Sequence, residues 1–185
     1  MKPTEQLKDE HQGVKLMLKI LRKASEKMHG GTGIPHEHLE HMVEFFRVFV
    51  DRCHHAKEEE LLFPAMRAAG IPGVEAPIRQ MCDEHEQGRG LIRAIADAAA
   101  RCKAGDHKAP AKIVAEAQVY RDLLIPHIEK EETVLYPMAD AGLSGEAQAA
   151  LAEGFERIEK EKIGAGTHEK FHEMMRRLQG VYLKE

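Results

Sequence analysis

Histidine and glutamate residues recur in this chain in a pattern that occurs twice. The sequence DEH at residues 9–11 is followed by HHAKEEELLFP at 54–64, and DEH at residues 83–85 is followed by HIEKEETVLYP at 127–137. An internal repeat indicates that one structural unit occurs twice, and this repeat predicts two helix–loop–helix halves. Each half supplies two imidazoles and one carboxylate. Four imidazoles and two carboxylates related by a pseudo-twofold axis would form a site with room for two metal ions.

The spacing within each longer segment places a histidine and a glutamate on the same helical face. His54 and Glu58, like His127 and Glu131, are four residues apart, which is about one turn of an α-helix. Apolar residues precede each pair at intervals of four, so the pairs continue the core-facing stripes of their helices. A single pair of this kind is usually solvated, but a repeated one, preceded each time by DEH, indicates a buried site.

The burial of these side chains has an energetic consequence that points to metal ions. Each ionised group that is buried without a partner costs several kcal/mol. Divalent cations remove that cost, because neutral imidazole and carboxylate are the forms that bind them. A nitrogen and oxygen ligand set without thiolates favours iron or manganese, with zinc and copper as alternatives.

Glycine and proline residues divide the chain into six predicted helices, and no period-two run of β-branched residues predicts a strand. The first four predicted helices are long and joined by short loops, at about residues 4–28, 35–70, 76–103 and 110–140. We therefore predict an all-α fold, an up-down-up-down four-helix bundle. Pro64 and Pro137 lie near the ends of the second and fourth helices and should bend their last turns.

The rest of the chain predicts two shorter helices, at about residues 145–162 and 167–183. We expect the bundle to occupy residues 1–142. Residues 143–185 would then form a C-terminal helical extension that packs on the bundle as a lid.

Composition and charge limit the classes of partner. The 185 residues are 43% hydrophobic and 31% charged, which is typical of a globular domain. The net charge of −4 is not gathered into a basic stripe, so we expect no nucleic-acid partner. No stretch reaches the ~18 apolar residues of a membrane span, so we expect a cytoplasmic protein without a membrane partner. Three cysteines without Cys-x-x-Cys spacing are expected to be reduced.

The two His-x-x-x-Glu-Glu segments, each preceded by a lone histidine on the helix before, resemble the hemerythrin-like, His-His-Glu cation-binding family over about residues 5–140. The resemblance implies a non-haem di-iron centre with two bridging carboxylates and an oxo or hydroxo bridge, with manganese or zinc as alternative metals. The ligands that it implies are His11, His54, Glu58, His85, His127 and Glu131. The second copy supports His54 over His55, because Ile128 stands at the position equivalent to His55. Glu59 and Glu132 are expected to be solvated or to contact a ligand.

The ligand pattern differs from that of the oxygen-carrying hemerythrins. Those proteins place an additional histidine pair on the third helix and an aspartate on the fourth, whereas this chain has one histidine, His85, and a glutamate, Glu131. This pattern resembles the repair-of-iron-centres di-iron proteins of bacteria.

The resemblance implies a centre that binds or reacts with dioxygen, nitric oxide or peroxide, in oxidative or nitrosative stress response or in iron handling. Whether the chain is an enzyme stays open. As an enzyme it would be a di-iron oxidoreductase acting on one of these molecules, with an electron donor or an iron acceptor as a further partner. The alternatives are an oxygen-binding, storage or sensing protein without turnover, and a purely structural metal site.

The C-terminal extension contains a second metal-binding signature. The sequence HEKFH at residues 168–172 matches the His-Glu-x-x-His of zinc peptidases. That activity needs a third ligand, a cleft and a substrate-binding strand, none of which the sequence indicates. We expect instead a flap that brings His168, or less favourably His172, near the open side of the centre, as a metal ligand or a partner of one. The other alternative is that both are surface residues.

Overall fold

The computed structural model describes residues 1–164 and 166–184 of the chain. Throughout these residues the chain is helical and has no strand, so the all-α prediction is confirmed. The first and third helical runs are α1 (Pro3–His29) and α4 (Glu75–Lys103). The second run joins α2 (His36–Phe45), the π-helical segments η1 (Phe46–His55) and η2 (Glu58–Leu62), and α3 (Phe63–Ala68). The fourth joins α5 (Ala109–Lys130), the π-helical segment η3 (Glu131–Leu135), and α6 (Tyr136–Gly142).

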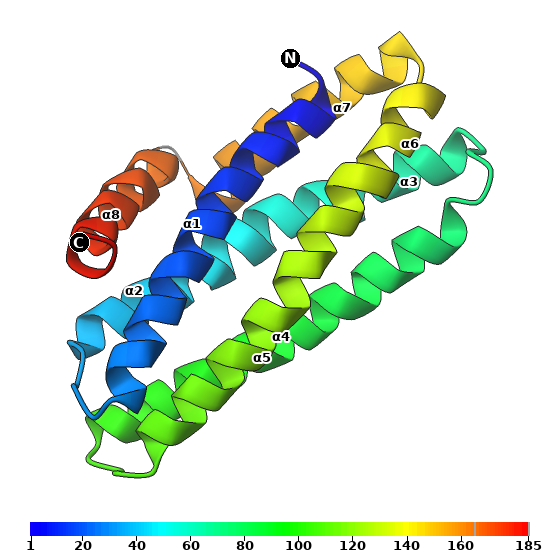
Figure 1. Cartoon of the computed structure of the whole chain (residues 1–185). Helices are drawn as coiled ribbons and strands as arrows, with labels where there is room; N and C mark the ends of the chain where they lie inside the picture. The colour runs from blue at the N-terminus through cyan, green and yellow to red at the C-terminus, as the bar shows by residue number, and fades with distance from the viewer. Residues whose placement is uncertain (165, 185) are drawn as a thin grey trace.

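Short loops connect these runs and set them side by side. Residues 30–35 and 104–108 lie at one end of the molecule, and residues 69–74 lie at the other (Figure 1). Gly70 and Gly105 have positive φ angles of 64° and 94° in the turns after α3 and α4. Glycine adopts this left-handed backbone without the steric cost that other residues meet, which is why these helices end where the sequence predicts.

The two prolines near the ends of the second and fourth runs coincide with π-helical turns. The N–H groups of Phe63 and Tyr136 bond the carbonyls of Glu58 and Glu131, five residues earlier. A proline one residue later removes a backbone donor and crowds the carbonyl four residues before it, which disturbs the ordinary α-helical register. The helices therefore continue through the prolines with a widened turn, and that turn begins at the two glutamates of the predicted site. Such π-helical turns occur frequently at functional sites.

A polar layer divides the apolar core into two clusters. On α1, Leu7 belongs to one cluster and Val14 to the other, with buried His11 between them. The second run repeats this order, with Val50 and Leu62 on either side of buried His54. The predicted ligands therefore lie in the middle of the helices, where apolar packing on both sides excludes water.

The C-terminal segments pack against the first two runs. They are α7 (Gly145–Ile158), the π-helical segment η4 (Glu159–Ile163), and α8 (Thr167–Tyr182). α7 and α8 contact α1, η4 contacts η1, and Phe155 and Phe171 enter the two core clusters (Figure 1). None of the described helices has the length and apolar character needed to span a membrane.

Candidate metal centre

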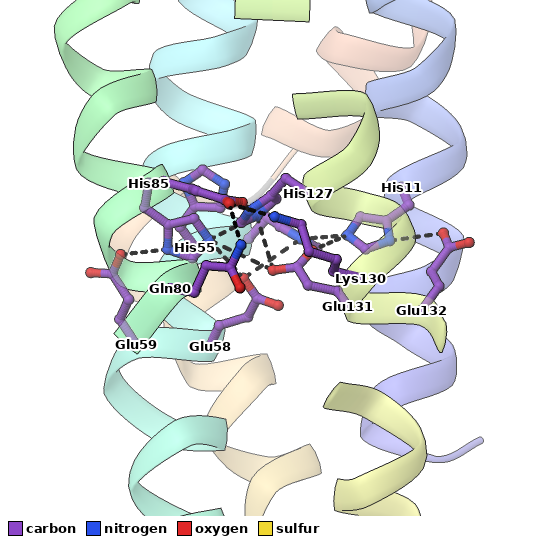
Figure 2. A network of polar contacts seen from close by, with 12 residues as sticks. His11, His55, Glu58, Glu59, Gln80, His85, His127, Lys130, Glu131 and Glu132 are labelled. Carbon is purple, nitrogen blue, oxygen red and sulfur yellow. Dashed lines mark hydrogen bonds and ion pairs between the residues drawn. The ribbon is translucent and has the colours of Figure 1, made fainter. Parts of the chain in front are cut away.

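Four buried imidazoles, those of His11, His54, His85 and His127, meet in two close pairs at the level of the polar layer. Figure 2 labels three of them, His11, His85 and His127. The Nε2 atoms of His11 and His54 lie 3.0 Å apart, and those of His85 and His127 lie 3.1 Å apart. Each of the four residues is at most 2% exposed. Since His11 and His54 come from the first copy of the repeat and the other two from the second, each half builds one pair.

Two fully buried carboxylates lie between the histidine pairs. Glu131 Oε2 is 3.2 Å from His11 Nε2, and Glu131 Oε1 is 3.0 Å from His127 Nε2. Glu58, which belongs to the first half, places its Oε2 3.4 Å from His85 Nε2 of the second half. Each carboxylate thus reaches across to the other half, as ligands that bridge two metal ions must.

The outer nitrogen of every imidazole donates to a further carboxylate. These Nδ1–H groups and their acceptors are His11 to Glu132 at 2.9 Å, His54 to Glu10 at 2.8 Å, His85 to Glu59 at 2.7 Å and His127 to Glu84 at 2.8 Å. Figure 2 shows Glu59 and Glu132 on opposite sides of the centre, each directed at an imidazole. The structure therefore gives these two glutamates the ligand-contacting role. Glu10 and Glu84 had no predicted role, although the sequence carries a signal for them, the glutamate before each lone histidine.

Each of the four outer carboxylates also binds a cationic side chain. The pairs are Glu10 with Lys57, Glu84 with Lys130, Glu59 with Arg89 and Glu132 with Lys15. Both lysines of the first two pairs directly precede one of the two buried glutamates, Glu58 or Glu131, and both cations of the last two follow a lone histidine by four residues. The repeat thus extends beyond the predicted ligands to the groups that contact them.

Burial and charge set the protonation of the centre before a metal ion binds. Burial, together with the charge of Glu131, raises the pKa of Glu58 well above its ordinary value. Burial lowers the pKa of His127, but Glu131 and Glu84 outweigh it and raise that pKa to about 9. Burial lowers the pKa of His54 to about 4. Both raised pKa values favour the protonated forms of Glu58 and His127, and a metal ion would have to displace those protons.

The arrangement of lone pairs fits metal ions. A neutral imidazole has one N–H, and the bond from Nδ1 to a carboxylate leaves Nε2 with a lone pair. In each histidine pair, two such lone pairs face and repel each other. The proton on His127 can remove this repulsion between His85 and His127, but not between His11 and His54. Among the described residues, Glu58 Oε2 and both Glu131 oxygens have no hydrogen-bond partner. Two groups of converging donors result, His11, His54 and Glu131 in one and Glu58, His85 and Glu131 in the other. Cations placed there satisfy all of these atoms.

Comparison with known proteins agrees with this geometry. The model of the hemerythrin HHE cation-binding domain matches residues 2–139. The chain belongs to the hemerythrin family. Uncharacterized proteins of Mycobacterium bovis (Mb2018) and Mycobacterium tuberculosis (MT2051 and Rv1995) are each 26% identical to it over 161 residues. The match covers 86% of this chain but 62% of each relative, so the chain spans less than two thirds of their length. No solved structure shows significant similarity to it.

His55 is a residue of this hemerythrin-family centre for which the sequence predicted no role. It is 5% exposed, and its ring stacks on that of His85 with centroids 3.8 Å apart and planes 15° apart. One of its ring nitrogens lies within 4.8 Å of ring nitrogens of His85 and His127. The π-helical segment η1 holds His54 and His55 with both side chains buried. The sequence prediction assigned only the residues spaced four apart to the site and left out their neighbours, although Ile128, which follows His127 in the α-helix α5, is buried too.

Tyr136 breaks the symmetry of the centre. Its hydroxyl donates to Glu58 Oε1 at 2.7 Å and lies 3.4 Å from His11 Nε2. The equivalent residue of the first half is Phe63, whose ring stacks near His85 without a polar atom. Only one of the two bridging carboxylates therefore receives this hydroxyl.

The structure does not bring the histidines of α8 to the predicted ligands. His168 lies against Phe49, and its Nε2 is 3.9 Å from Cys53 Sγ, while His172 is exposed. No described hydrogen bond or ion pair joins either histidine to the imidazole pairs or to the bridging carboxylates. His168 instead forms a separate group with Cys53 and Glu159, because it packs against the part of η1 that carries Phe49 and Cys53.

Proposed function

We propose that this hemerythrin-family chain is a non-haem di-iron protein in which Glu58 and Glu131 bridge two iron ions, each bound by one histidine pair. The observation that carries the proposal is the convergence of four Nε2 atoms on two buried carboxylates, three of whose four oxygens have no hydrogen-bond partner among the described residues. Nitrogen and oxygen donors without a thiolate favour iron, and two histidines per ion with shared carboxylates leave coordination positions open. The proposal includes an up-down-up-down arrangement of the four long runs around the centre, with the C-terminal segments as a cover.

The chain's own residues would hold and tune such a centre. The four outer carboxylates fix the imidazole rings and increase their basicity, and the cations paired with those carboxylates hold them in place. The apolar clusters above and below exclude water from the layer. Tyr136 holds one oxygen of Glu58 and leaves the other free for a metal ion.

A bound di-iron pair supplies electrons and Lewis acidity toward dioxygen, nitric oxide or peroxide. We therefore propose a role in oxidative or nitrosative stress response or in iron handling, with an electron donor or an iron acceptor as partner. The cysteines Cys53, Cys82 and Cys102 are free, which supports a reducing compartment such as the cytoplasm.

The experiment that tests the proposal is metal content per chain, measured by mass spectrometry on protein purified from iron-replete cells without added metal. About two iron atoms per chain are expected. Rapid mixing of the ferrous protein with dioxygen, peroxide or nitric oxide then separates the alternatives. Turnover indicates an enzyme, reversible binding indicates storage or sensing, and no reaction indicates a structural site. One zinc that is lost on replacement of His168 and His172, but kept on replacement of His54 and His127, would overturn the proposal.

A further inference from the structure

A cavity of about 280 Å³ opens beside the metal centre, between η1, α4 and α5. Buried residues form its floor: Phe46, His55, Gly88, Ile92 and Tyr120. A side-chain carbon at Gly88 would meet only the Tyr120 ring, at an ordinary contact distance of 3.5 Å, so packing does not require glycine at this position. The missing side chain instead keeps the cavity open one turn from His85.

The ring of His55 on this floor has a nitrogen atom without a hydrogen-bond partner among the described residues. This atom, Nδ1, is buried, and the nearest carboxylate, Asp51 Oδ1, is 3.6 Å away. A buried polar atom without a partner is costly, so such atoms commonly mark a bound ligand or water. Because the His55 ring also stacks on His85, a molecule bound at His55 would lie one imidazole away from the metal ions.

The rim of the cavity is positively charged. Four arginines line it, namely Arg47, Arg52, Arg89 and Arg93, against one acidic residue, Asp51. Arg89 is bound to Asp51 and Glu59, both at 2.7 Å. Within the described residues Arg47 and Arg52 form no ion pair, so two guanidinium groups at the rim stay free to bind an anion.

The equivalent pocket of the other half differs in its floor. It lies between α1 and α5 and is lined by Gln12, Lys15, Leu16, Leu18, Lys19, Arg22, Arg121 and Ile125. Leu124 and Ile128 stand at the positions equivalent to Asp51 and His55, and Val14 stands at the position of Gly88. These three apolar residues are buried and carry no polar side-chain atom. Since the repeat has apolar residues in these places, it does not by itself require His55, Asp51 or Gly88 beside the predicted ligands.

We propose that this cavity binds a small monovalent anion of the formate or nitrite type, held between Arg47, Arg52 and the ring of His55 beside the metal centre. The planar guanidinium fork matches an anion with two acceptor oxygens, and neutral imidazole can donate one hydrogen bond. The cavity of about 280 Å³ has room for an anion of this size. The consequence of this binding, which is to place a ligand next to the metal ions, rests on the proposed function. The binding itself needs only these side chains.

The test is formate binding to the purified protein by isothermal titration calorimetry, with iron content measured on the same samples. The cavity variants are the double substitution Arg47→Ala and Arg52→Ala, and His55→Ile, which introduces the residue type of the second half. The matched control replaces Lys19 and Arg22 with Ala, because it removes the same two charges from the other half's surface. We expect formate binding to weaken about tenfold or more in both cavity variants, as for a lost charge-assisted contact, and to be unchanged in the control.

The possible outcomes separate this inference from the proposed function. No formate binding by the wild type, or equal binding by wild type and cavity variants, overturns the inference even when two iron atoms per chain are present. Loss of iron in His55→Ile also overturns it, because His55 would then be a metal ligand. Arginine-dependent formate binding by protein that takes up no iron supports the inference and contradicts the di-iron function.

Discussion

Glu10 and Glu84 stand at equivalent positions of the repeat but bind lysines that differ in burial. A comparison of the two tests whether that burial decides how much each glutamate contributes to stability. Each accepts a hydrogen bond from a histidine and binds a lysine, His54 and Lys57 for Glu10 and their counterparts for Glu84. The lysines differ: the side chain of Lys57 is fully buried, whereas that of Lys130 is 35% exposed. Lys57 has one further partner, Glu159 of η4, at 2.6 Å.

Replacement of each glutamate by glutamine should therefore have unequal effects on folding. Glu10→Gln leaves a buried ammonium group with Glu159 as its only anionic partner, which costs about 3 kcal/mol. Glu84→Gln leaves an ammonium group that water reaches, which costs about 1 kcal/mol or less. For a chain of this size the melting temperature should fall by roughly 6–12 °C in the first variant and by roughly 2–4 °C in the second.

Scanning calorimetry in the presence of a chelator measures these differences without the contribution of bound metal. Iron affinity, measured separately, should fall by about 10–100-fold in both variants, because each loses one carboxylate that orients a histidine ligand. Equal losses of melting temperature would refute the reasoning, since they would show that the buried Lys57 contributes no more to folding than the exposed Lys130.

The remaining predictions concern the centre itself. Glu58→Ala and Glu131→Ala should each abolish binding of the metal pair, because we propose that both carboxylates bridge it; full iron content in both variants would show that the ligand assignment is wrong. His55→Ala should keep its iron, and a large loss there would make His55 a ligand. Tyr136→Phe should keep iron but lower the free energy of unfolding by about 1 kcal/mol, measured by denaturant titration, because one hydrogen bond to Glu58 is lost. An unchanged unfolding free energy would mean that this bond does not contribute to folding.

Local spacing was sufficient to predict much of the structure. The helices occur where glycine, proline and apolar periodicity placed them, because these signals act within a few residues along the chain. The six side chains that meet at the centre were also predictable, since an i,i+4 pair that continues an apolar stripe must face the core. The repeat then indicated that two copies of the same unit contribute their side chains to one site.

The contacts that orient the centre depended on tertiary structure. Glu10 meets His54 from 44 residues away, and Glu132 meets His11 from 121 residues away, so no local pattern specifies which carboxylate serves which imidazole. The position of α8 likewise depended on tertiary structure. The sequence HEKFH does not specify which face of the bundle the helix covers, and packing of Phe171 into the core brings His168 to Cys53.

His55 shows the limit of the sequence most clearly. The spacing of four residues selects His54 for the core and leaves its neighbour His55 undecided, but in the packed structure both rings are buried. The cavity beside it requires, in addition, that Gly88 on α4 and Tyr120 on α5 lie across from η1. The sequence alone thus determined the helices and the inward-facing side chains of the predicted ligands, because both follow from periodicity. Only the packed helices decided the hydrogen-bond partners, the backbone register at the centre and the open space next to it.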